Sequence, residues 1–270
     1  MGDWSLDPLQ LAPIVMVGVA YGVRARTLER RGNPVPRWKI ALFALGLLLL
    51  LASVVSPIAQ LGEERFSFHM VQHILLGDLA PLALLAGLNG PLLRPLLALP
   101  PLQALRVLVH PLVALPIWVA NLYLWHVPFA YTAAIDNGFV HAIEHLSFFT
   151  AGVIMWAPVV EVLPGPAWFG SAAKLGYIVV VRLVETVLAN VFLWSGEVFY
   201  DPYASVGLSD QAAAGAIMMI EGSLVTIAAF AWLFLRMFAE GERRQELLEA
   251  GGDPRTVERA VRYGRADRLS

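Results

Sequence analysis

Histidine is scarce in this sequence, yet four of its histidines form two pairs with the same spacing. The chain has 6 histidines among 270 residues. His69 and His73 stand in the segment FSFHMVQH, and His141 and His145 stand in HAIEH. Side chains four residues apart on a helix share one face, with their Cβ atoms about 6 Å apart. Because neutral imidazole is the commonest metal ligand, each pair is suited to form one side of a metal site.

The absence of cysteine limits the kinds of metal site that this chain can form. The sequence offers no thiolate ligand and no disulfide. Structural zinc sites commonly use cysteine, whereas copper binds imidazole and, in its reduced state, thioether. Met70 lies inside the first pair, and Met218 and Met219 lie in a later apolar segment. We therefore expect copper at the histidines, with zinc or haem as alternatives.

Composition and long apolar segments identify the elements that must hold these histidines. Hydrophobic residues make up 58% of the chain and charged residues 15%, against about 25% charged residues in soluble proteins. Roughly 20 apolar residues suffice for a helix to cross a bilayer, and the alternation typical of a membrane barrel is absent from the sequence. We predict an all-α membrane protein with a single bundle of seven transmembrane helices. The predicted spans are residues 9–23, 39–59, 66–88, 107–127, 138–160, 172–194 and 210–237.

Lysine and arginine near the ends of the spans predict how the bundle is oriented. Such residues favour the cytoplasmic side of a membrane. They gather in the connections after the first, third and fifth spans and in the C-terminal tail, whereas the other side shows only Arg65. We therefore predict that the N-terminus lies outside and the C-terminus in the cytoplasm. Residues 1–239 would form the transmembrane domain, and residues 240–270 a charged, helical cytoplasmic tail.

In this orientation, five of the six histidines lie at the outer ends of their spans. The two pairs occupy the first turns of the third and fifth spans, and a further histidine ends the fourth. Only His110 lies on the cytoplasmic side. Two matched pairs at one depth indicate a shared site rather than separate histidines bonded to nearby carbonyls. The predicted ligands of this outer-leaflet metal site are His69, His73, His126, His141 and His145.

Other polar or thioether side chains near this level are candidates to support the site. Glu144 is the neighbour of His145, and a carboxylate often orients an imidazole that binds a metal. Two polar residues open the seventh span, and a methionine follows two turns later. Methionine in a helix more often fills space than binds metal. The supporting candidates are Glu144, Asp210, Gln211 and Met218.

Four charged residues are predicted to lie deeper, near the middle of the bilayer. Charges at this depth are costly unless they are paired or hydrated, and they often mark functional positions. We predict that Arg182 pairs in the bundle interior, either in a stabilising ion network or along a proton or ion path. The predicted midplane network consists of Asp78, Arg182, Glu185 and Glu221.

Four segments of the chain resemble the polytopic CtaG family of bacterial cytochrome c oxidase assembly proteins. They are FSFHMVQHILLGDLAPLALL, HPLVALPIWVANLYLWHVPFAY, HAIEHLSFFTAGVIMWAPVV and DQAAAGAIMM, in the family's order between residues 66 and 220. The resemblance places the five outer histidines, Asp210, Gln211, Gly215 and Met218 at the family's characteristic positions. It implies a multi-pass protein of the bacterial plasma membrane that acts in the maturation of copper-containing oxidases. The implied partners are oxidase subunits, membrane lipids and extracytoplasmic copper chaperones.

The sequence leaves three other functions open beside that of an assembly factor or metallochaperone, which we favour over an enzyme. A b-type cytochrome could ligate haem with histidines on facing helices, although small residues near the pairs are few. An intramembrane zinc hydrolase could use HAIEH, which fits the His-x-x-Glu-His pattern, although HMVQH has Gln at the position of the base. A copper transporter could use the midplane charges. The net charge of −2 gives no sign of nucleic-acid binding, and the seventh span has no lysine for retinal.

Overall fold

The computed structural model describes residues 8–99, 105–163 and 165–262. Every regular element in these ranges is a helix, and they contain no strand. Large apolar side chains on the long helices are widely exposed, as surfaces that face lipid require. Examples are Met16, Leu48, Leu112 and Leu224, each more than 60% exposed. The prediction of an all-α polytopic membrane protein is confirmed.

Six helices are long and apolar enough to cross a membrane, and a bent pair can provide a seventh span. The bent pair is α8 with α9, whose axes meet at 71°. Counting this pair as one span gives the predicted number of seven. The spans are α1 (Pro8–Arg30), α2 (Arg37–Val55), α4 (Phe66–Ile74) with η1 (Leu75–Leu79) and α5 (Ala80–Ala86), α8 (Pro111–His126) with α9 (Pro128–Asp136), α10 (Gly138–Val160), α11 (Ser171–Trp194) and α12 (Leu208–Glu249).

Prolines set two span boundaries that the apolar pattern placed wrongly. The second span ends at Val55 rather than at residue 59, because Pro57 starts the separate helix α3 (Pro57–Glu64). The fourth span starts at Pro111 rather than at residue 107. Val127 is extended, with φ −71° and ψ 132°, since a residue before proline avoids the helical conformation. This extended residue produces the bend between α8 and α9.

The remaining helices lie outside the spans that the structure forms. The Pro-rich segment after the third span contains α6 (Gly90–Leu97) and the short helix η2 (Leu105–Val107). The loop between α11 and α12, named the outer loop after the predicted orientation, contains η3 (Asp201–Tyr203), and α13 (Pro254–Arg262) lies in the tail. Helix α12 continues to Glu249, so the predicted boundary between residues 239 and 240 falls within an unbroken helix.

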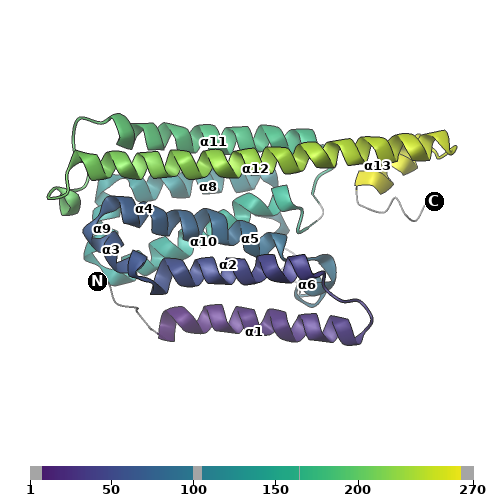
Figure 1. Cartoon of the computed structure of the whole chain (residues 1–270), viewed down its shortest axis with the longest axis horizontal. Coiled ribbons are helices and arrows are strands. Elements are labelled where there is room, and N and C mark those ends of the chain that lie inside the picture. The colour runs from purple at the N-terminus through teal and green to yellow at the C-terminus, as the bar shows by residue number, and fades with distance from the viewer. Residues whose placement is uncertain (1–7, 100–104, 164, 263–270) are drawn as a thin grey trace. The chain divides into compact units, whose positions relative to one another are not determined.

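The chain divides into two compact units, and the histidines lie in the first of them. This unit comprises Met1–Gly165 and Val184–Glu221, and the second comprises Pro166–Leu183 and Gly222–Ser270. In the first unit α10 packs against α8, α5 and η1, while α2 packs against α5 and α1 (Figure 1). In the second unit Ser171 of α11 donates a hydrogen bond to Glu240 of α12, at 3.2 Å.

A π-helical turn directly after His73 brings the third span against α10. Residues Leu75–Leu79 form this wide turn, η1, which lies between α4 and α5 without a break. A Cβ atom added at Gly152 of α10 would collide with the carbonyl oxygen of Gly77. The two backbones are therefore in direct contact, the close approach that small residues allow in membrane bundles. Nothing in the apolar pattern of the sequence predicts the π-turn.

Candidate metal centre

Helices α4 and α10 bring the two histidine pairs together. Within each pair the ring centroids are 4.3 Å apart for His69 and His73 and 4.2 Å apart for His141 and His145. Between the helices, His69 lies 5.7 Å from His141, and His73 lies 5.7 Å from His145. Four imidazoles from two spans therefore form one cluster.

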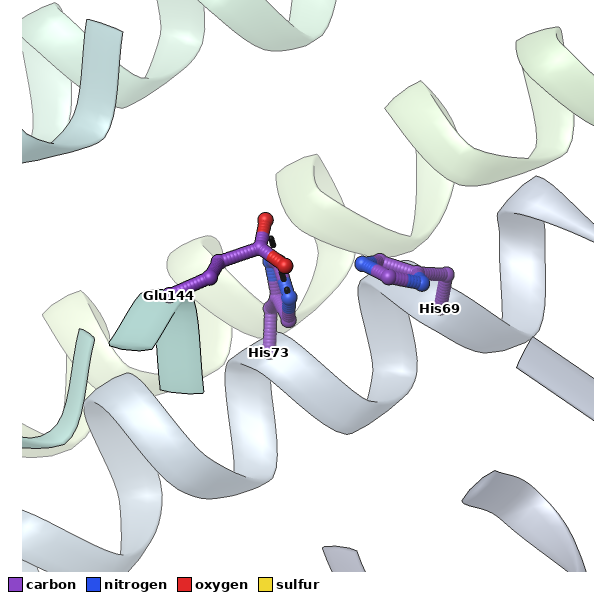
Figure 2. A group of neighbouring side chains, drawn as sticks. All are labelled: His69, His73 and Glu144. Atoms are coloured by element: carbon purple, nitrogen blue, oxygen red, sulfur yellow. Dashed lines mark ion pairs between the residues drawn. The ribbon is translucent and has the colours of Figure 1, made fainter. Parts of the chain in front are cut away.

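Glu144 lies at the centre of this cluster and is fully buried. Its Oε1 atom lies 3.7 Å from Nε2 of His73, and its Oε2 atom lies 4.0 Å from Nε2 of His141. Figure 2 shows the carboxylate of Glu144 facing the ring of His73, with His69 one turn away on the same helix. The sequence predicts only a supporting role for Glu144. Its position among the imidazoles makes it a candidate ligand.

Glu144 belongs to two overlapping groups of candidate ligands. One ligand atom from each of His69, His73 and Glu144 lies within 4.8 Å of the other two, and the same holds for His141, Glu144 and His145. A single ion near Glu144 or one ion in each group would both fit this arrangement. Imidazole together with carboxylate is a donor set that suits copper or zinc.

Several potential ligand atoms of the cluster are buried without a hydrogen bond. Within the described part of the chain, this holds for both carboxylate oxygens of Glu144, both ring nitrogens of His73, and Nε2 of His69, His141 and His145. Burying a polar atom without a hydrogen-bond partner costs about 1–3 kcal/mol, and more for a charged group. A bound cation would compensate these atoms at once. The residues therefore fit a metal ion.

His126 lies beside the cluster but belongs to neither group. Its Nδ1 atom donates a hydrogen bond of 2.7 Å to the Leu122 carbonyl, because a carbonyl oxygen can only accept. In the neutral ring, Nε2 then carries no proton and has a lone pair that could bind a metal. Nε2 is buried and has no hydrogen bond among the described residues. The ring centroid lies 6.4 Å from that of His73. His126, the fifth predicted ligand, therefore has a fixed ring orientation and lies next to the two groups rather than within them.

Asp210 positions α4 rather than joining the histidines. Its carboxylate accepts hydrogen bonds from the Ser67 hydroxyl at 2.5 Å and from the Ser67 backbone N–H at 3.2 Å. The first N–H groups of a helix have no partner within the helix, so this aspartate of α12 caps α4 from outside. Ser67, two residues before His69 in the first turn of α4, is thereby tied to α12.

Removing this cap is expected to destabilise the protein. Asp210→Ala should lower the free energy of unfolding by about 0.5–2 kcal/mol, the usual cost of losing a helix cap. Thermal unfolding in detergent measures the effect. Asp201→Ala, which removes an exposed carboxylate in the outer loop, is the control. Equal melting temperatures for the two variants would contradict the capping role.

Gln211 fastens the outer loop between α11 and α12. Its amide accepts a hydrogen bond from the Phe199 N–H at 2.9 Å and donates one to the Glu197 carbonyl at 3.0 Å. Both contacts are with loop backbone. Gln211 therefore supports the loop, and its supporting role at the histidines stays a prediction.

Tyr131 of α9 contacts the histidine cluster and links it to the tyrosines of the outer loop, a role that the sequence did not predict. The ring of Tyr131 lies 5.0 Å from that of His69 and stacks on Tyr200 at 3.9 Å. Tyr200 donates a hydrogen bond to the His126 carbonyl, and Tyr203 donates one to the carbonyl of Gly62. Burial raises the pKa of Tyr200 and of Tyr203, so both hydroxyls remain neutral donors that hold the loop in place.

Three of the four predicted midplane residues lie around one cavity of the first unit. Asp78 lies in η1 and accepts a hydrogen bond of 2.5 Å from Nε1 of Trp156. Asp78, Glu185 and Glu221 line one cavity of the first unit. Arg182 belongs to the second unit, where its guanidinium lies against the backbone of Gly222. The pairing of Arg182 with one of these acids stays a prediction.

Known proteins with similar sequences include one protein family and several mycobacterial proteins. The family model described as cytochrome c oxidase caa3 assembly factor (Caa3_CtaG) matches residues 19–240. Uncharacterized proteins of Mycobacterium bovis and Mycobacterium tuberculosis are each 23% identical over 240 residues, which cover 79% of this chain and 36% of theirs. One of Mycobacterium leprae is 23% identical over 196 residues, which cover 66% of this chain and 29% of its own.

This chain spans about a third of the length of those relatives. No solved structure matches it. The family model covers all the histidines of both groups, together with Glu144 and the residues that fasten the outer loop. The chain belongs to the cytochrome c oxidase caa3 assembly factor family.

Proposed function

We propose that this protein binds copper within the membrane and supplies it to a cytochrome c oxidase during assembly. The observation that carries the proposal is the buried cluster of four imidazoles around Glu144, whose ligand atoms lack hydrogen bonds within the described ranges. Membership of the assembly factor family supports the oxidase as the client. Copper would be cargo, so the role would be that of a metallochaperone rather than an enzyme.

The donor set and the available space favour a bare ion over haem. The cavity beside His73 and His126 has a volume of about 50 Å³. Pockets for organic ligands of moderate size usually measure about 300–1,000 Å³. Copper also suits the mixture of imidazole, carboxylate and nearby thioether in a chain that has no thiolate.

The predicted orientation supplies a route for the cargo. With the N-terminus outside the bacterial plasma membrane, α4 and α10 would present the histidines near the outer surface. Copper would then arrive from that side, carried by an extracytoplasmic chaperone, and leave towards an oxidase subunit in the same membrane. The outer loop held by Gln211 lies between the histidines and that surface in this proposal.

Metal analysis of the purified protein tests the proposal. Wild type incubated with copper should retain it through gel filtration, whereas a variant with alanine at His69, His73, His141 and His145 should not, because all four imidazoles are lost. His110→Ala is the control, since His110 precedes α8 and His126 ends it, about 24 Å away along the helix axis. Equal copper content in wild type and the quadruple variant would refute the metal site. Retention of zinc alone would refute the choice of copper.

The same quadruple variant tests the role in assembly. Cells that carry it should lose cytochrome c oxidase activity while the transcripts of the oxidase subunits stay unchanged. Normal oxidase activity in cells whose only copy is this variant would contradict a role of the histidines in assembly.

A further inference from the structure

A small cavity lies directly beside the histidine cluster, in the interior of the first unit. Its volume of about 50 Å³ is several times the roughly 10–15 Å³ that one water molecule needs. Its lining residues come from α4, η1, α8, α10, α11 and α12. His73 forms part of its wall, so this histidine belongs both to the cluster and to the cavity.

His126 lines the same cavity, and its ring is oriented as that of a metal ligand would be. The hydrogen bond from Nδ1 to the Leu122 carbonyl fixes the tautomer and the ring orientation. Metal-binding histidines usually have their second nitrogen held in this way. The side chain is only 8% exposed, and its Nε2 atom makes no hydrogen bond in the described part of the chain.

Two thioethers complete a donor set that differs from that of the cluster. Met70 and Met218 line the cavity and are 1% and 9% exposed. Thioether with imidazole favours soft monovalent ions such as Cu(I), whereas the cluster offers imidazole and carboxylate. Asp78 and Glu221 also line the cavity, so it has carboxyl oxygens as well as sulfur and nitrogen in its wall.

We propose that this cavity is a second metal position, which takes Cu(I) through Nε2 of His126 and the thioether of Met218. His73 would be shared, binding an ion in either position and so linking the cluster to the cavity. The proposal rests on the proposed function, because it adds a position next to the copper-binding cluster. It assigns Met218, which the sequence offers only as a supporting residue, to a ligand role.

Titration with Ag(I), a soft monovalent ion that stands in for Cu(I), tests the second position. With one ion in the cluster, calorimetry on this chain in detergent should give two bound ions for the wild type. Met218→Leu and His126→Gln should each remove one of them or weaken it at least tenfold. Both substitutions preserve approximate size, and equal melting temperatures would establish that the variants are folded. Met219→Leu, one residue from Met218 and absent from the cavity wall, should still bind two.

A double variant with alanine at His141 and His145 separates this inference from the proposed function. It should lose the ion of the cluster and keep the ion that depends on Met218. If the wild type binds neither silver nor copper, the proposed function fails and the second position fails with it. If metal binds and depends on His141 and His145, but Met218→Leu and His126→Gln bind as the wild type does, only the second position is overturned.

Discussion

Glu144→Gln is expected to lower the copper affinity of the purified protein at least tenfold while the protein stays folded. Glu144 is the carboxylate common to both groups of candidate ligands, and glutamine keeps its shape but not its charge. Loss of a group that merely orients a ligand already costs about 10–100-fold in metal affinity. Competition with a copper chelator measures the affinity. An affinity within twofold of that of the wild type would contradict the central position of Glu144.

Without metal, Glu144→Gln should not destabilise the protein, although it weakens copper binding. A buried carboxylate without a hydrogen bond is costly, so Glu144→Gln should melt no lower than the wild type when copper is absent. Added copper should raise the melting temperature of the wild type by mass action and leave that of the variant nearly unchanged.

Gln72 provides a matched control, because it holds the same place in HMVQH as Glu144 holds in HAIEH. Its side-chain amide donates a hydrogen bond of 2.8 Å to the Ser53 carbonyl of α2. Gln72→Ala should therefore lower the free energy of unfolding by about 0.5–1.5 kcal/mol and leave the copper affinity unchanged. The two variants together separate the metal site from the packing of α4.

Gly152→Ala is expected to destabilise the bundle and to weaken metal binding together. The added Cβ would collide with the Gly77 carbonyl oxygen and lie 2.8 Å from the Gly77 carbonyl carbon. Backbone atoms cannot rotate away as a side chain can, so α10 must move from η1. Overpacking of this kind costs about 1–3 kcal/mol. Because α10 also carries His141 and His145, copper affinity should fall along with the melting temperature.

Gly176→Ala on α11 is the control for this prediction. A Cβ atom there meets nothing within 4 Å, and alanine is the better helix former by about 1 kcal/mol. Its melting temperature should therefore equal or exceed that of the wild type, with unchanged copper binding. If Gly152→Ala behaves in the same way, the contact between α10 and η1 does not position the site.

The sequence alone determined the helical class, most of the spans and the shared face of each histidine pair. These features depend on local physics. A long apolar segment must form its hydrogen bonds internally when it crosses a bilayer, and a spacing of four residues places two side chains on one face of any helix. The motifs also identified the family, which the match to residues 19–240 confirms.

Only the tertiary structure decided what each polar residue does. Glu144 and Gln72 occupy equivalent places in matching motifs. Glu144 lies among the imidazoles, whereas Gln72 donates a hydrogen bond to a carbonyl of α2. Asp210 caps α4 across 143 positions of the chain. These roles depend on which helices pack together and on the π-turn after His73, and neither is encoded in the spacing of apolar residues along one helix. The sequence therefore supplies the candidate ligands, and the packing of α10 against α4 and η1 decides which of their atoms converge.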